Sequence, residues 1–361
     1  MKKVLAVGPD IDLVGGISNF MKSYLESMSG NQSYQVDYFD TYKVKSRKIQ
    51  KKSSFSLKEI KASFLVFWSF FKVLASQNFD YVLLNSSSYW GFWEKTALLI
   101  IVRFFSKSHI VFLVHGGEFK TFYEKSSVKF LIKLSLNFCQ NVCFVSRESF
   151  CFFDSILKTN CRYFILPVQP PISLDESIDE YFLNIREKYK WVFLSISVLE
   201  DRKRVQDVID FFIEQSNDDS CLLVCGDGIE KEIIKEKCCS KKNIFFIGAV
   251  KGNKKSSVFN MSDFFVSFSK EESFGITTIE AMLSKVLVFS TPVGILNDIG
   301  IDGVNYIRLD DKRVNNIFDC GFINEISMVY DEIVGSAYNI ASDFLWEKNI
   351  KKINEIFFEY K

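Results

Sequence analysis

The sequence predicts an α/β protein made of two domains, each built around a doubly wound parallel sheet. Short β-branched and aromatic runs alternate with longer stretches of helical composition along all 361 residues, as in βαβ units. This length is enough for two domains of ordinary size, each with its own core. The alternation breaks at Pro167-Val-Gln-Pro-Pro171, because proline cannot continue a strand, and an acidic segment, 175–187, follows. We therefore expect two Rossmann-like domains, 1–170 and 171–341, with a hinge at these prolines.

Twelve strand-like runs are predicted, six in each half. In the first half they are Lys3–Val7, Gln35–Phe39, Tyr81–Asn85, Ile110–Val114, Val142–Val145 and Tyr163–Leu166. In the second half they are Trp191–Ile196, Cys221–Cys225, Ile244–Ile247, Phe264–Phe268, Val286–Phe289 and Tyr306–Leu309. The chain then ends in a stretch with Leu345, Ile350, Ile353 and Phe357 on one helical face. That pattern predicts a terminal amphipathic helix.

The first strand runs into a loop that ends in Gly15-Gly16, and apolar residues at helical spacing follow from Ile17 to Met28. Two glycines at a helix N-terminus let the backbone approach a ligand closely. A dinucleotide-binding loop is the rival interpretation. The sequence has no GxGxxG pattern here, which weakens that rival.

A basic segment precedes an aromatic one in the first half. Eight cations and a single acid, Glu59, lie between Tyr42 and Lys61, and the run Phe64-Leu-Val-Phe-Trp-Ser-Phe-Phe71 follows. Such a pair can lie on anionic lipid. It is equally consistent with a solvated loop before a buried helix, so the contact of Lys43–Phe71 with a membrane is one of two open interpretations.

His115 follows the apolar run Ile110–Val114, at the carboxyl end of a predicted strand. In open α/β sheets that end faces the ligand crevice. A lone histidine is also commonly a structural residue, and both interpretations stay open at this point.

Three cations, Arg202, Lys203 and Arg204, follow another predicted strand and precede a helical stretch. A cation at that place can stabilise the negative charge that develops on a leaving diphosphate. Solvated cations at the start of a helix are the alternative.

The stretch from Lys270 to Ser284 carries the clearest chemical signal. An apolar strand leads into it, Gly275 breaks the chain, and Ile276 to Leu283 has helical composition. The free amides of such a turn make an anion site at the helix N-terminus. Glu272 then lies at its mouth, while Glu280 lies among apolar neighbours and needs hydrogen-bond donors. A ligand's hydroxyl pair or another part of the protein could supply those donors.

Three segments here resemble the donor-site signature of retaining glycosyltransferases of family 4. They are Glu272-Ser-Phe-Gly275, Glu280-Ala-Met282 and Val286–Gly294. The resemblance implies the GT-B architecture, in which two Rossmann-like domains face a central cleft. The first domain would be on the acceptor side, the second would bind the nucleotide sugar, and the terminal helix, about 342–361, would pack back on the first.

The same resemblance implies site residues. The catalytic set would be Glu272, which contacts hydroxyls of the donor sugar, Lys203, and His115, which contacts donor sugar or acceptor. The donor-binding set would be Gly15, Gly16, Arg202, Ile247, Gly248, Phe274, Gly275, Ile276, Thr277 and Glu280. Within it, Glu280 would bind the ribose diol, and the backbone near Ile247 would border the base. One departure is Val198, which stands where family members usually have an arginine.

We therefore expect a metal-independent hexosyltransferase that retains the anomeric configuration. Its donor would be a nucleotide sugar, UDP-linked rather than GDP-linked, and no cofactor is expected. Its acceptor would be a glycan or lipid-linked hydroxyl in bacterial lipopolysaccharide or capsule synthesis. Charge stabilisation by Lys203 and helix N-termini would make a metal unnecessary.

Composition excludes several other classes. Lys plus Arg is 45 against 44 for Asp plus Glu, so no overall field favours nucleic acid. The nine cysteines form no CxxC pair and there are only two histidines, which argues against a metal site and for reduced cytosolic thiols. The start resembles a strand rather than a signal peptide, and no apolar stretch is long enough to span a bilayer. We expect a cytoplasmic protein, peripheral on the inner face of the plasma membrane if Lys43–Phe71 binds lipid.

Two other functions remain open. A nucleotide-sugar epimerase of the same architecture would need acid and base groups around one sugar, and the chain has few histidines for that work. A non-catalytic subunit that binds a sugar nucleotide is suggested by Val198.

Overall fold

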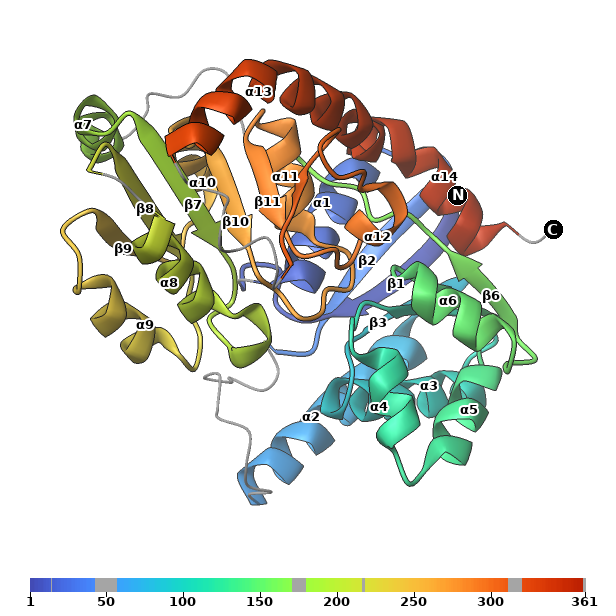
Figure 1. Ribbon diagram of the computed structural model, residues 1–361. Coiled ribbons are helices and arrows are strands. Elements are labelled where there is room, and N and C mark those ends of the chain that lie inside the picture. Colours follow the sequence, from blue (N-terminus) through green and yellow to red (C-terminus); the bar gives the residue numbers. More distant parts are fainter. Residues whose placement is uncertain (14, 43–56, 171–179, 216–217, 311–319, 360–361) are drawn as a thin grey trace. The chain divides into compact units, whose positions relative to one another are not determined.

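The computed structural model describes residues 1–13, 15–42, 57–170, 180–215, 218–310 and 320–359 (Figure 1). The chain forms two compact units. Unit 1 comprises Met1–Pro167 with Trp346–Lys361, and unit 2 comprises Val168–Leu345. The chain enters and leaves unit 2 side by side, because Val168 forms a parallel bridge with Leu345 and donates its N–H to the carbonyl of Phe344 (2.8 Å). The first part of unit 1 thus ends at 167 and unit 2 ends at 345, whereas the predicted ends were 170 and 341.

Unit 1 contains a six-stranded sheet in the order β2-β1-β3-β4-β5-β6, in which every pair is parallel. The strands are β1 (Lys2–Gly8), β2 (Tyr34–Asp40), β3 (Tyr81–Ser86), β4 (His109–Val114), β5 (Asn141–Phe144) and β6 (Asn160–Tyr163). The helices are α1 (Gly16–Met28), α2 (Leu57–Ser76), α3 (Trp90–Phe105), α4 (Phe119–Lys125), α5 (Lys129–Asn137), α6 (Arg147–Asp154) and α14 (Trp346–Phe358). Figure 1 shows helices against both faces of this sheet.

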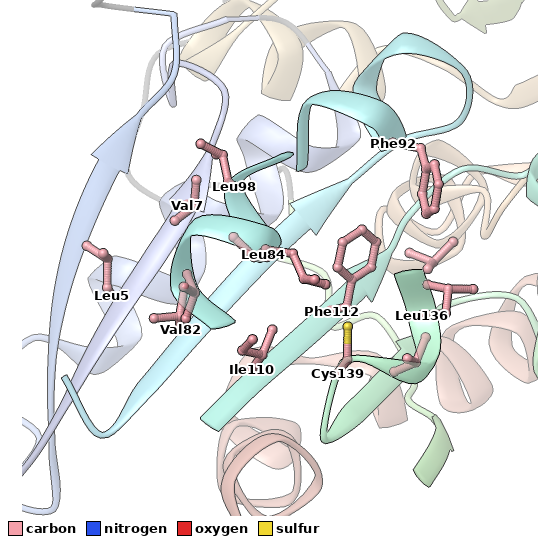
Figure 2. Close-up of a cluster of buried hydrophobic side chains, with 14 of the residues drawn as sticks. Leu5, Val7, Val82, Leu84, Phe92, Leu98, Ile110, Phe112, Leu136 and Cys139 are labelled. Atoms are coloured by element: carbon pink, nitrogen blue, oxygen red, sulfur yellow. The ribbon is translucent and has the colours of Figure 1, made fainter. Parts of the chain in front are cut away.

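The two faces of the unit 1 sheet carry different helices. Alternate strand residues such as Leu84 and Phe112 join one cluster with buried side chains of α2 to α6 (Figure 2). On the other face α1 packs against α14, where the Tyr24 hydroxyl donates to Asn354 (3.2 Å) and the Tyr24 and Phe357 rings lie 6.2 Å apart. The terminal helix is therefore part of the core of unit 1.

One strand prediction in unit 1 is wrong in position. The expected strand was Tyr163–Leu166, whereas β6 is Asn160–Tyr163. Residues 160–163 form a polar, partly exposed edge strand, so no apolar run marks it. Phe164, the next residue, still donates its N–H to the carbonyl of Phe144 in β5 (3.1 Å), and its side chain is buried against Phe357 (ring centroids 5.2 Å apart).

Unit 2 contains a second parallel sheet, in the order β12-β11-β10-β7-β8-β9. The strands are β7 (Trp191–Ile196), β8 (Ser220–Cys225), β9 (Ile244–Gly248), β10 (Phe264–Ser267), β11 (Leu287–Ser290) and β12 (Ile307–Arg308). The helices are α7 (Glu180–Lys188), the 3-10 turn η1 (Asp201–Lys203), α8 (Val205–Gln215), α9 (Lys231–Cys238), α10 (Gly252–Asn260), α11 (Ile276–Leu283), α12 (Leu296–Ile299), α13 (Cys320–Ala341) and the 3-10 turn η3 (Ser342–Phe344).

The strand order of unit 2 reverses between β7 and β10. From β7 the chain adds β8 and β9 on one side, and it then returns to add β10, β11 and β12 on the other. The loops that leave the carboxyl ends of β7 and β10 therefore begin side by side at the switch point, which is where open α/β sheets commonly bind ligands. These two loops carry Lys203 and Glu272.

Candidate active site in unit 2

The loops after β7 and β10 are joined by backbone and side-chain contacts. The N–H of Lys270 donates to the carbonyl of Arg202 (2.8 Å). Beside that bond, the Lys203 ammonium forms an ion pair with Oε1 of Glu272, and the side chains are only 10% and 17% exposed. The same oxygen accepts from the Ser269 hydroxyl (3.3 Å). Two residues that lie 69 positions apart in the sequence thus form one charged pair at the switch point.

Burial dominates the electrostatics of this pair. Desolvation lowers the pKa of Lys203, and the positive charge of Arg202 lowers it further, while the carboxylate of Glu272 opposes both effects. A buried ammonium with a single carboxylate partner has hydrogen-bonding capacity left, since it carries three donors. An additional anion at this place would therefore be stabilised.

The N-terminus of α11 lies next to Glu272 in the same loop. Gly275 precedes the helix in the left-handed region, with φ of 92°. Among the described residues, none accepts a hydrogen bond from the amides of Phe274, Gly275, Ile276 or Thr277, and the first amide used inside the turn is that of Thr278. Four amides at a helix N-terminus, beside a lysine, form a site suited to a phosphate group.

Gly294 supports this loop from the segment after β11. The N–H of Ile295 donates to the carbonyl of Phe274 (2.7 Å), which fixes the loop against that segment. Gly294 has φ of 59°, and a Cβ atom there would lie 2.5 Å from the carbonyl oxygen of Phe274 and 2.9 Å from Cβ of Glu272. Only glycine fits so close to the turn that presents the carboxylate.

Glu280 is buried one turn inside α11, at 6% exposure. Its Oε1 pairs with the Lys255 ammonium (2.5 Å) from α10, whereas its Oε2 has no hydrogen-bond partner. Burial raises the pKa of Glu280, and Lys255 opposes the shift. The protein therefore supplies one of the donors that this carboxylate needs, and its second oxygen is buried with no donor from the described residues.

Lys255 was missed by sequence reasoning. It lies in a short polar helix, and nothing about its neighbours distinguishes it from a solvated lysine. The predicted base-binding residues Ile247 and Gly248 lie at the end of β9, a few residues before α10, on the same sheet edge as the loops after β7 and β10. Gly248 has φ of 76°, so it turns the chain out of the sheet.

The arginines near Lys203 are engaged with their own neighbours. Arg202 pairs with Glu200 (2.6 Å) and donates to the carbonyl of Glu271 (3.3 Å). Arg204 pairs with Asp207 and lies over the ring of Phe268. Val198 is 39% exposed. Lys203 is thus the cation of this loop that is held directly against the Glu272 carboxylate.

The remaining predicted site residues lie in unit 1. Gly15 precedes α1 and Gly16 begins it, and a Cβ atom at Gly15 would meet nothing within 4 Å. His115 follows β4 and is buried against Phe20 of α1, with ring centroids 5.1 Å apart.

His115 is a neutral hydrogen-bonding group. Burial lowers its pKa to about 3, so the imidazole carries no charge at neutral pH. Its Nε2 lies 2.9 Å from Oδ1 of Asn85, whose amide nitrogen donates to the carbonyl of Val7 (3.1 Å). Since Oδ1 accepts, Nε2 carries the proton and Nδ1 can accept a hydrogen bond. The sequence predicts Asn85 only as the last residue of a strand, and its hydrogen bond to His115 was missed.

Within the described ranges, no three His, Cys, Asp or Glu side chains come together in a way that could hold a metal ion. Likewise, none of the described helices is both long enough and apolar enough to cross a membrane. The basic part of the predicted membrane segment, Lys43–Phe71, lies largely outside the described residues.

Gly294→Ala should disrupt the site, because its methyl group would collide with Phe274 and push Glu272 away from Lys203. Gly303→Ala is the matched control, since Gly303 also has positive φ (73°) but a Cβ atom there meets nothing within 4 Å. We expect Gly303→Ala to cost about 1 kcal/mol of unfolding free energy. Gly294→Ala should cost at least about 1 kcal/mol more. Urea unfolding of both variants measures this, and equal costs would contradict the crowding at Gly294.

Comparison with known proteins finds sequence similarity to glycosyltransferases. Residues 178–317 match the family model described as glycosyl transferases group 1. The O-antigen chain mannosyltransferase RfbU of Salmonella typhimurium is 24% identical over 198 residues, which is 54% of each chain. The N-acetyl-alpha-D-glucosaminyl L-malate synthase of Bacillus anthracis is 32% identical over 120 residues, 32% of this chain and 30% of that one. The chain thus matches about half, or less, of the length of these curated relatives.

Solved structures match over nearly the whole chain. Sucrose-phosphate synthase from Thermosynechococcus elongatus gives a TM-score of 0.78 at 13% identity, and the match covers 99% of our chain and 98% of the synthase chain. Anabaena HepE, solved with UDP and glucose, gives a TM-score of 0.72 at 16% identity, and the match covers 98% of our chain and 99% of the HepE chain. At such identities the match concerns the fold, and the fold is that of the GT-B glycosyltransferases. Residues 178–317, a little over a third of the chain, are thus similar to the glycosyl transferases group 1 family.

Proposed function

We propose that this protein is a retaining hexosyltransferase. It would move a sugar from a nucleotide sugar, UDP-linked rather than GDP-linked, to a hydroxyl of a glycan or lipid-linked acceptor in bacterial surface polysaccharide synthesis. The observation that carries the proposal is the arrangement of groups at the switch point of unit 2. There, unbonded amides at the start of α11 lie beside the Lys203–Glu272 pair, so that one place combines an anion site with a carboxylate suited to sugar hydroxyls.

The donor diphosphate would bind the amides of Phe274 to Thr277. The Lys203 ammonium, which has donors left beside Glu272, would also pair with the diphosphate. Glu272 would then accept from hydroxyls of the donor sugar, since Oε2 is not engaged by the Lys203 ammonium. Farther inside, the free Oε2 of Glu280 would accept from the ribose, while Lys255 keeps the other oxygen paired. The HepE structure was solved in complex with UDP and glucose, and this supports the choice of a UDP-linked donor for our chain.

The chemistry would be a substitution at the anomeric carbon. The bond from that carbon to the phosphate oxygen breaks, and its electron pair stays on the diphosphate, where Lys203 and the α11 amides stabilise the added charge. The acceptor oxygen then bonds to the same face of the sugar and gives its proton to the leaving phosphate. Configuration is retained without a protein nucleophile.

Three parts of the proposal concern contacts outside the switch point of unit 2. His115, neutral at physiological pH, would contact the donor sugar or the acceptor as a hydrogen-bonding group rather than as a general base. Gly15 and Gly16 would allow the backbone to approach the diphosphate. The protein would be cytoplasmic and peripheral on the inner membrane face, with Lys43–Phe71 contacting anionic lipid.

A second candidate function is a non-catalytic subunit that binds a sugar nucleotide. It is favoured by Val198, an exposed apolar residue where family members usually have an arginine, and by the engagement of Arg202 and Arg204 with neighbouring acids. Binding of a nucleotide sugar without transfer or hydrolysis would identify this alternative.

Glu272→Ala and Lys203→Ala should each lower the rate of sugar transfer at least about a hundredfold, because each removes a contact to the transition state. Lys270→Ala and Glu271→Ala are the matched controls. They lie in the same loop, but the Lys270 ammonium pairs with Asp201 (3.1 Å) and Glu271 is exposed, so near wild-type rates are expected. Product configuration, measured by NMR, should be retained. Wild-type rates in either site variant with an intact fold would remove the assignment.

Chelation should leave transfer unchanged, since the proposed charge stabilisation uses Lys203 and helix amides. Transfer is measured after EDTA treatment and again after Mg²⁺ or Mn²⁺ is added. Complete loss that a divalent ion restores would refute the metal-free mechanism.

The role of Glu280 can be separated from phosphate binding. Glu280→Gln should weaken UDP about tenfold or more, since a hydrogen bond to a charged group is lost. Pyrophosphate, which has no ribose, should bind the variant and the wild type equally. Calorimetric titration with both ligands checks this, and an equal loss for both would place Glu280 outside any ribose site.

A further inference from the structure

The outer sides of α2 and α3 in unit 1 are unusually apolar. Their inner sides supply buried residues such as Val66, Phe70 and Leu98 to the core. Their outer sides carry large side chains that are 46–78% exposed, and we call this set the aromatic face: Phe64, Leu65, Trp68, Ile100, Phe104 and Phe105. A helix that is apolar on both sides is normally covered on both sides.

The aromatic face is continuous across the two helices. Phe71 stacks on Trp68 (ring centroids 5.9 Å apart) and meets Phe105 edge to face (5.0 Å). Helix α5 packs on the same face of the sheet through Ile132, and it exposes Phe130 at 72%. A patch of this extent marks an interaction surface in a soluble protein.

The charges around the aromatic face all have one sign. Lys72, Arg103 and Lys107 are exposed in or directly after the two helices, and Lys129 is exposed at the start of α5. Among the described side chains of α2, α3 and α5 the only carboxylate is Glu94, which is buried. Lys72 extends over the ring of Trp68 (5.5 Å), as a lysine does when its stem covers apolar surface and its ammonium reaches a polar layer.

We propose that the aromatic face is a docking surface for an anionic lipid bilayer. Tryptophan and phenylalanine enter the boundary between headgroups and acyl chains, and a ring of cations pairs with lipid phosphates. A second copy of the chain fits poorly, because a twofold contact would bring both sets of cations together, and the described side chains of α2, α3 and α5 include no exposed carboxylate to face them. The inference rests on the lipid contact of Lys43–Phe71 in the proposed function and extends it to α3, and vesicle binding tests it separately from sugar transfer.

Vesicle flotation of the full-length protein tests the surface directly. The wild type should bind vesicles of phosphatidylcholine with phosphatidylglycerol at least about tenfold more tightly than phosphatidylcholine alone, and high salt should weaken the binding. Lys72→Ala, Arg103→Ala and Lys107→Ala together should weaken it on the order of a hundredfold.

The apolar contribution has its own matched control. Trp68→Ser, Phe104→Ser and Phe105→Ser together should weaken binding at least about tenfold. The control carries three equally drastic changes at exposed apolar positions of unit 2, namely Ile229→Ser, Ile233→Ser and Val304→Ser, and should bind as the wild type does.

A single, milder substitution keeps the test valid if the triple serine variant does not fold. Brominated lipid should quench tryptophan emission on binding, and Trp68→Phe should bind but lose at least about half of that quenching. Absent binding, equal binding to neutral vesicles, or unchanged quenching in Trp68→Phe would overturn the proposal. A concentration-dependent dimer that disappears in the aromatic variant would also overturn it, since a second copy would then cover the face.

Discussion

The Lys203–Glu272 ion pair depends on the reversal of strand order between β7 and β10. Parallel strands all end at the same edge, and the reversal makes β7 and β10 neighbours, so their loops meet where open α/β sheets commonly bind ligands. The loop after β7 supplies the cation, and the loop after β10 supplies the carboxylate and the start of α11. The site is therefore a consequence of topology, because the strand order brings these two loops into contact.

Two lysine–glutamate ion pairs lie at different depths along α11 in unit 2, and each has hydrogen-bonding capacity left. Lys203 holds Glu272 at the mouth of α11, and Lys255 holds Glu280 deeper in the helix. In both pairs burial opposes the charged state, and in the deeper one a carboxylate oxygen is left without a partner. A buried polar group that lacks a hydrogen-bond partner costs free energy, and a ligand that supplies the missing partner removes this cost. Ligand binding at this site therefore has a source of free energy.

Sequence reasoning succeeded where the local pattern decides the structure. The strand before Glu272, the break at Gly275 and the helix Ile276–Leu283 all follow from short-range composition, and all are present. It failed where distant residues decide. The edge strand β6 has no apolar run, so its position depended on neighbours that the local sequence does not reveal. Lys255 and Asn85 gain their roles from contacts with residues 25 and 30 positions away.

The central claim is that a diphosphate binds the four unbonded amides at the start of α11. Amide NMR of 15N-labelled protein during titration with UDP measures this directly. The account predicts that the resonances of Phe274, Gly275, Ile276 and Thr277 shift most, together with that of Lys203, and that they saturate with the same affinity. If UDP binds while those amide resonances stay in place, the diphosphate lies elsewhere and the account is wrong.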